Sequence, residues 1–210
     1  MLYQILFLVI GWLLGLLSPV VADFFSKKRR QVEVKAGLGV ELAELRFSLV
    51  SATLSVASSA GALDQEYVAW LKAALEAQRG AREEDRKALL ETVGKLGGLD
   101  EQQLAAVARS LGPPPAASAL TKHRLPYLES KLDYLSSLPP AAQRQLLEIQ
   151  AQIGVINELL DDIRFCQAKS FDSLPPSTRQ AIDASLQTSY RAVLQSSRNA
   201  ADLIGALKLG

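Results

Sequence analysis

The chain has almost none of the side chains that carry enzyme chemistry. Its 210 residues include one cysteine, Cys166, and one histidine, His123. One cysteine excludes an intramolecular disulfide framework and fits a reducing compartment, and one cysteine with one histidine cannot complete a structural zinc site. The sequence also lacks a Gly-x-Ser-x-Gly turn and a glycine-rich phosphate loop. We therefore predict a protein that is not an enzyme, with no catalytic residue, no cofactor and no metal.

The chain also has little net charge and few of the sequence patterns that predict β-strands. Lysine and arginine number 23 and aspartate and glutamate 22, for a formal net charge of +1, so net charge gives no support to nucleic-acid binding. Apolar and polar residues do not alternate for more than a few positions, whereas apolar residues recur every three to four positions from about residue 38 onward. The sequence therefore predicts an all-α fold.

What the chain has is one long apolar run at its start. Residues 1–22 carry no charged side chain, and residues 5–22 would span about 27 Å as a helix, close to the thickness of a bilayer core. A cleaved signal peptide is the alternative, but no lysine or arginine precedes the run and four cations follow it closely, which opposes translocation. We therefore predict an uncleaved, single-pass transmembrane anchor.

The cations that follow the run predict its direction. Lys27, Lys28, Arg29 and Arg30 are consecutive, and cations near the end of a span stay on the cytoplasmic side. We expect the amino terminus outside, the rest of the chain in the cytoplasm, and the anchor in a bacterial inner membrane. The same cations are expected to contact anionic headgroups.

Small residues follow one face of the predicted anchor. Gly11 and Gly15 form a GxxxG pair, and Ser18 and Ala22 continue roughly the same face. Small residues let helix backbones approach closely in lipid, which predicts self-association of the anchor. The alternative is that these residues face lipid.

The remaining sequence divides at helix punctuation and at a proline-rich stretch. Asp64 and Asp100 each precede a periodic run and are expected to start helices. The sequence GPPPAAS predicts a linker. The predicted segments are an anchor (1–26), a basic juxtamembrane segment (27–37), a membrane-proximal helical region (38–111), a linker (112–118) and a distal helical region (119–210).

The distal region is predicted to be a long antiparallel helical hairpin within a bundle. The sequence SLPP occurs at 137–140 and again at 173–176, and each copy places prolines ahead of a long periodic run. In both runs the apolar or small residues are spaced by threes and fours, as in a coiled coil. The first seam is Leu146, Ile149, Ile153, Ile156, Leu160 and Ile163, and the second is Ile182, Leu186, Ser189, Val193, Ser196, Ala200 and Leu203.

A serine-rich segment stands out near the predicted membrane surface. Residues 47–63 carry no charge, and Ser48, Ser51, Ser55 and Ser58 share one helical face. Small hydroxyl residues on one face predict close helix packing. A second span or a re-entrant element is the alternative, which the five serines and one threonine of the segment disfavour.

Few residues are candidates for binding a small ligand or for chemistry. Lys122, Arg124 and Lys131, with tyrosines nearby, predict at most a tentative site for an anionic ligand. His123 is expected to be neutral in an exposed loop, and Cys166 to be a small buried thiol.

These patterns together predict a scaffold of the inner membrane. We expect a single-pass protein whose cytoplasmic helical bundle, with coiled-coil character, self-associates as a homo-oligomer or docks a protein partner. The alternative is a regulated, membrane-perturbing effector that forms a pore or depolarises the membrane, with the bundle as its sensor.

Overall fold

The computed structural model is built from helices throughout the part of the chain that it describes. It describes residues 2–78, 82–111, 121–170 and 175–209, and among the first 27 residues it describes side chains only at Tyr3, Trp12 and positions 24–26. No strand occurs among these residues, which confirms the predicted all-α fold and the helical bundle. In chain order the elements are α1 (Leu2–Ser59), α2 (Gln65–Glu76), α3 (Glu83–Gly97), α4 (Glu101–Leu111), α5 (Pro126–Ser130), the 3-10 helix η1 (Leu132–Ser137), α6 (Pro140–Ser170) and α7 (Pro176–Ala206).

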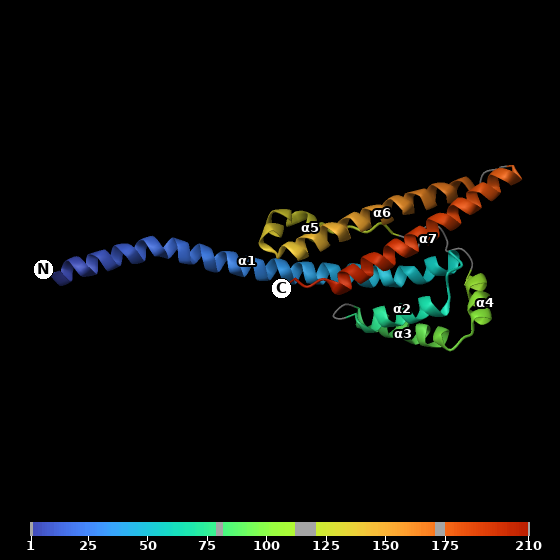
Figure 1. Cartoon of the computed structure of the whole chain (residues 1–210), viewed down its shortest axis with the longest axis horizontal. Coiled ribbons are helices and arrows are strands. Elements are labelled where there is room, and N and C mark those ends of the chain that lie inside the picture. Colours follow the sequence, from blue (N-terminus) through green and yellow to red (C-terminus); the bar gives the residue numbers. More distant parts are fainter. Residues whose placement is uncertain (1, 79–81, 112–120, 171–174, 210) are drawn as a thin grey trace.

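Helix α1 is the axis of the molecule. It is one helix of 58 residues, about 87 Å long at 1.5 Å per residue. Its first half projects alone, and its second half runs through the bundle, against α7 on one side and α2 and α4 on another (Figure 1). The sequence analysis divided this stretch into an anchor, a basic segment and part of a helical region, whereas the structure joins all of them in one helix.

The end of α1 explains why the helix is so long. Between Pro19 and Gly61 the chain has no proline, and the first break comes where Gly61 adopts a left-handed φ of 62°. The N–H of Gly61 donates to the carbonyl of Ser58, and the N–H of Ala62 donates to the carbonyl of Ala57. These two bonds form the Schellman motif that satisfies the last carbonyls of a helix.

Helices α6 and α7 form the predicted antiparallel hairpin, whose far end extends beyond the end of α1 (Figure 1). All six residues of the predicted α6 seam are buried. On α7, Val193 and Ala200 of the predicted seam are buried, but Ile182 and Leu186 are only half-buried. Because α7 packs against both α6 and α1, its buried face is wider than a coiled-coil seam. The buried residues of α7 are Tyr190, Val193, Leu194, Ser197, Ala200, Ala201 and Ile204.

Two aspartates start helices as predicted. The side chain of Asp64 accepts a hydrogen bond of 2.7 Å from the N–H of Tyr67 at the start of α2. Asp100 accepts from the N–H of Gln103 at 2.8 Å, and the Gln103 side chain accepts in return from the N–H of Asp100 at 3.0 Å. This reciprocal pair is a capping box at the start of α4.

The predicted linker, residues 112–118, lies outside the described residues. The regions before and after it share one hydrophobic core, to which α1, α2, α6 and α7 all contribute. The two regions therefore meet directly through the packing of α1 along α7.

Among the residues whose side chains the structure describes, no helix combines the length and the apolar character needed to cross a bilayer. Most of the predicted anchor, residues 5–22, lies outside that set. The structure therefore gives no support to the transmembrane helix, which stays a prediction from the sequence.

Candidate functional site

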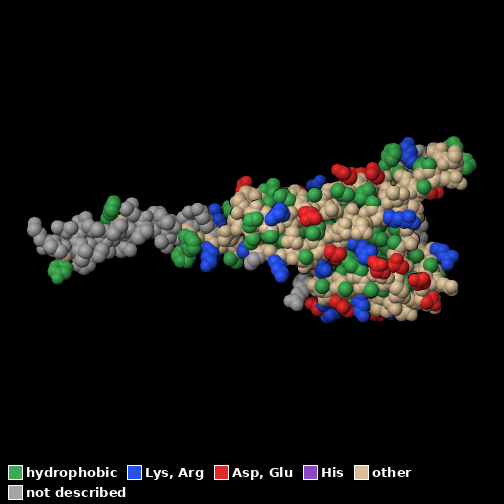
Figure 2. All heavy atoms as spheres, in the orientation of Figure 1, with side chains coloured by type: hydrophobic (Ala, Val, Ile, Leu, Met, Phe, Trp, Pro, Cys, Tyr) green, Lys and Arg blue, Asp and Glu red, His purple; other side chains and the backbone are tan. Residues whose placement is uncertain are grey.

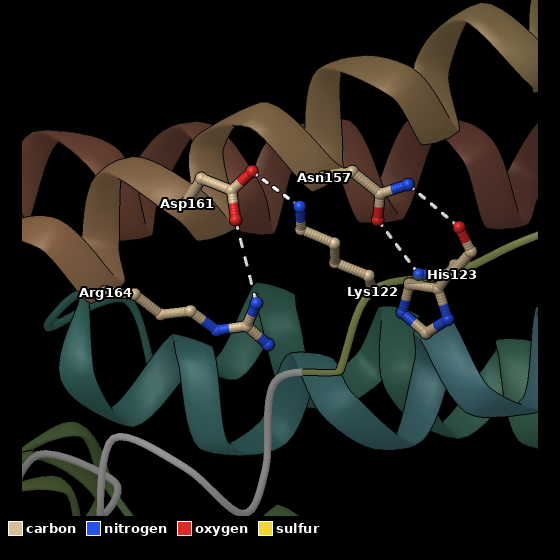
Figure 3. Close-up of polar contacts among 5 residues, drawn as sticks. All are labelled: Lys122, His123, Asn157, Asp161 and Arg164. Atoms are coloured by element: carbon tan, nitrogen blue, oxygen red, sulfur yellow. Dashed lines mark hydrogen bonds and ion pairs between the residues drawn. The ribbon is translucent and has the colours of Figure 1, made fainter.

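Two of the three cations of the tentative anionic-ligand site have separate partners. Lys122 Nζ lies 2.6 Å from Oδ2 of Asp161, whose other oxygen lies 3.7 Å from Nη1 of Arg164 (Figure 3). Lys131 Nζ instead lies 5.9 Å from the ring centres of both Tyr127 and Tyr134, and Arg124 is exposed. No described contact joins one of these cations to another, and Lys122 is already neutralised by a carboxylate.

Asn157 of α6 also holds the segment that carries Lys122, through the backbone of His123. Oδ1 of Asn157 accepts a hydrogen bond of 2.9 Å from the N–H of His123, and Nδ2 of Asn157 donates one of 2.8 Å to the carbonyl of the same residue (Figure 3). These two hydrogen bonds satisfy the backbone N–H and carbonyl of His123, which belongs to no helix. This contact was not predictable from the sequence, because the two residues lie 34 positions apart.

His123 itself is half-buried, which corrects the expected exposed loop. Its imidazole points away from α6 (Figure 3). Burial lowers the pKa of His123 below its ordinary value of 6.5, so the ring is neutral at pH 7, as expected.

This pKa shift predicts a loss of stability in mild acid. Between the lowered pKa of the folded state and about 6.5 in the unfolded state, the unfolded chain binds more protons, so the free energy of unfolding falls as pH falls through that window. We expect the urea midpoint of the wild type to decrease from neutral pH to about pH 5. A His123→Gln variant should show a smaller decrease, and an equal decrease in both proteins would contradict the assignment.

The serine-rich segment lies inside the bundle. Phe47, Leu49 and Val50 are buried there, and Ser51 Oγ donates to the carbonyl of Phe47 at 2.8 Å. Ser58 Oγ donates to the carbonyl of Ala108 at 3.1 Å and thereby joins α1 to α4. Ser48 and Ser55 are half-buried.

The residues predicted to act in the membrane fall largely outside the described side chains. This is true of Gly11, Gly15, Ser18 and Ala22, and also of Lys27. The side chains of Lys28, Arg29 and Arg30 are exposed. Arg29 Nε lies 3.4 Å from Oε1 of Glu33, one turn along the same helix.

A polar junction that the sequence did not predict joins α1 and α7 to Gln78, which lies two residues after the end of α2. Arg46 is buried, with its Nε donating to the carbonyl of Ala201 and its Nη1 donating to Oε1 of Gln78, both at 3.0 Å. Nε2 of Gln78 donates at 2.8 Å to the carbonyl of Ala43. Burial lowers the pKa of Arg46, which the charge of Asp202 partly opposes. The group stays protonated, because the pKa of a guanidinium lies far above neutral.

Beside this junction lies an open cavity of about 230 Å³. Gly205 lies against the guanidinium of Arg46, because a Cβ placed there would come within 3.2 Å of Nε. Apolar residues from α1 and from the last turn of α7 and the residues after it line part of the cavity wall, beside Arg46 and Gln78. The junction ties α1 and α7 to the residues that follow α2, and we assign it a structural role.

A second junction fixes α5 on α1. The carboxylate of Glu41 accepts hydrogen bonds from the N–H groups of Tyr127 at 2.6 Å and Leu128 at 2.9 Å. Gly37 leaves room for the ring of Tyr127, which a side chain at position 37 would overlap. Glycine in mid-helix costs stability, so this close approach is the physical reason for the residue.

Within the described residues, no group of three or more histidine, cysteine, aspartate or glutamate side chains is arranged to hold a metal ion. Cys166 is half-buried rather than fully buried, and its Sγ lies 3.9 Å from Oγ of Ser185.

A scan of protein-family models and searches among curated proteins and solved structures found no match to this chain.

Proposed function

We propose that the chain is a non-enzymatic, single-pass protein of a bacterial inner membrane that holds a helical bundle at the cytoplasmic surface for self-association or partner docking. The observation that carries the proposal is the continuity of α1. Residues 2–22, which are uncharged, and part of the core of the bundle belong to one 58-residue helix, whose first half projects alone (Figure 1).

The side chains at the boundary of the two halves suit a membrane surface. Phe24 and Phe25 are exposed and pack edge to face, with ring centres 6.0 Å apart. Aromatic residues concentrate at the level of the headgroups. The exposed cations Lys28, Arg29 and Arg30 follow directly, and their position after the apolar run supports an outside amino terminus and a cytoplasmic bundle.

The geometry of α1 also supports a bundle held close to the lipid surface. Val34 is the first buried residue of the bundle and follows Arg30 by four positions, or about 6 Å along a helix. Since no flexible segment intervenes, the bundle cannot swing freely away from the anchor. Its visible face carries acidic and basic side chains side by side (Figure 2), a surface suited to contact with water and protein.

Membrane insertion is tested by extraction of isolated membranes at alkaline pH. The wild type should stay in the membrane pellet. A Val9→Arg/Leu14→Arg double variant should be released, because each arginine near the centre of a span opposes insertion by about 3 kcal/mol. The matched control is Leu147→Arg, at an exposed position of the bundle, and it should stay in the pellet.

The scaffold part of the proposal is tested on the full-length protein purified in mild detergent. Sedimentation should show a mass above that of the monomer or a co-purifying protein partner. A strict monomer that co-purifies with no other protein would contradict a scaffold role.

A further inference from the structure

A row of exposed side chains follows the face of α1 that is turned away from the bundle. Phe25, Val32 and Val40 are 63%, 62% and 68% exposed, and Ala36 is exposed between the two valines. Their spacing of seven, four and four residues keeps them on one side of a helix. Leu38, which is fully buried, lies on the opposite side.

Other elements occupy different sides of this part of α1. Arg30 Nη1 donates to the hydroxyl of Tyr134 at 3.5 Å, and the hydroxyl of Tyr127 donates to the carbonyl of Glu33 at 3.3 Å. Through these contacts α5 and η1 lie beside α1 and leave the exposed row uncovered.

The row ends where the bundle covers the same face. Arg82, just before α3, lies 3.1 Å from the carboxylate of Glu44 and 5.8 Å above the ring of Phe47. The exposed row therefore runs from Phe25 to Val40, about 24 Å of helix. A second helix can lie along this length before it meets the bundle.

The row continues a regular pattern that begins in the predicted anchor. From Gly11 to Ala36, the small or exposed residues on this face of α1 are spaced four, three, four, three, four, three and four positions apart. This is the heptad spacing of a coiled coil. In heptad terms, the a positions are Gly15, Ala22, Arg29 and Ala36, and the d positions are Gly11, Ser18, Phe25 and Val32.

We propose that α1 pairs with α1 of a second copy of this chain as a parallel, in-register, two-stranded coiled coil along this seam. The inference rests on the proposed membrane anchor, because two copies inserted with the same topology present their α1 helices in parallel and at the same depth. Small residues in the lipid let the two backbones approach closely. From the headgroup level onward, Phe25, Val32 and Ala36 bury apolar surface against their counterparts.

Charges beside the seam fit a parallel pair. Lys28 occupies a g position and Glu33 the e position of the next heptad, and in a parallel coiled coil these two positions face each other across the two chains. Arg29 occupies an a position, where a charged residue fixes register and strand number at a cost in stability. Its ion pair with Glu33 within the chain draws the guanidinium toward the edge of the seam.

Cysteine cross-linking in native membranes tests the pairing. In a Cys166→Ser background, single cysteines are introduced by Val32→Cys and Ala36→Cys on the seam and by Arg30→Cys to one side of it. Because a disulfide needs Cα atoms within about 7 Å, mild oxidation should give several-fold more covalent dimer at positions 32 and 36 than at position 30. Equal dimer at all three positions, or none at 32 and 36, would overturn the proposal.

A second measurement asks whether the apolar seam drives the association. Val32→Asp should reduce cross-linking of the Ala36→Cys protein several-fold, whereas the matched control Val155→Asp, at an exposed valine of α6, should leave it unchanged. Arg29→Leu, which replaces a charged a residue with an apolar one, should increase it. A lack of response to both Val32→Asp and Arg29→Leu would contradict the seam.

The amount of each variant in the membrane fraction distinguishes a failure of the proposed membrane anchor from a failure of the proposed α1 pairing. If the cross-linking variants are not in the membrane, the proposed function fails. If they are in the membrane and the seam cysteines do not cross-link, the pairing fails and the anchor stands.

Discussion

Leu146→Ala is expected to lower the free energy of unfolding by about 3 kcal/mol, whereas Leu147→Ala, one residue further, should change it by less than about 1 kcal/mol. Leu146 is fully buried in the α6 seam, and Leu147 is 52% exposed. Truncation of the buried leucine removes apolar contacts and leaves a cavity that a close-packed core refills only in part. Urea unfolding of the detergent-solubilised, full-length protein, followed by circular dichroism, measures both values.

The two leucines form a matched pair, because the replacement and the helix are the same and only the burial differs. A similar loss for both variants would contradict the difference in burial between the two positions, because alanine is the better helix former and propensity alone would stabilise both variants. A loss below about 1 kcal/mol for Leu146→Ala would contradict the packing of α6 on α7.

Arg46→Met is expected to cost about 3 kcal/mol, since hydrogen bonds from a charged donor contribute about 1.5 to 3 kcal/mol each. The change removes the donors to the carbonyl of Ala201 and to Oε1 of Gln78. Methionine keeps the apolar stem of the side chain and removes the guanidinium, so most of the expected loss comes from polar groups left without a partner at a buried site.

A double variant isolates the Arg46–Gln78 contact. Arg46→Met combined with Gln78→Met leaves no orphaned Oε1, so it should lose at least about 1 kcal/mol less than the sum of the two single variants. Additive losses measured by urea unfolding would show that Arg46 and Gln78 act independently.

The parts of the fold that local patterns determine were predictable. The α6 seam was predicted residue by residue, because one face of α6 packs mainly against α7 and heptad spacing describes such a face. Asp64 and Asp100 were predicted as helix starts, because their hydrogen bonds reach only three residues along the chain.

The parts that depend on tertiary contacts were not predictable from one sequence. Nothing local shows that α7 packs against α1 as well as α6, so Leu194, Ser197 and Ala201 were missed as buried residues. Arg46 is an ordinary arginine in the sequence, and only the meeting of α1 and α7 with the residues that follow α2 buries it. The single long helix α1 was missed because a change from apolar to basic composition was taken as a change of segment.

The candidate sites also depend on tertiary contacts that the sequence does not show. The tentative anionic-ligand group was chosen by nearness in sequence, and Lys122 instead meets Asp161, a residue 39 positions away. The exposed row on α1 became visible only when the structure showed which face of the helix the bundle leaves uncovered.

The measurement that tests the central claim most directly is the accessibility of single cysteines in intact cells with a permeable outer envelope. In a Cys166→Ser background, Tyr3→Cys reports on the amino terminus and Glu84→Cys on an exposed position of α3. A single-pass anchor with the bundle in the cytoplasm predicts that a membrane-impermeant maleimide labels position 3 at once and position 84 only after the inner membrane is lysed. Labelling of position 84 in intact cells, or protection of position 3 until lysis, would contradict it.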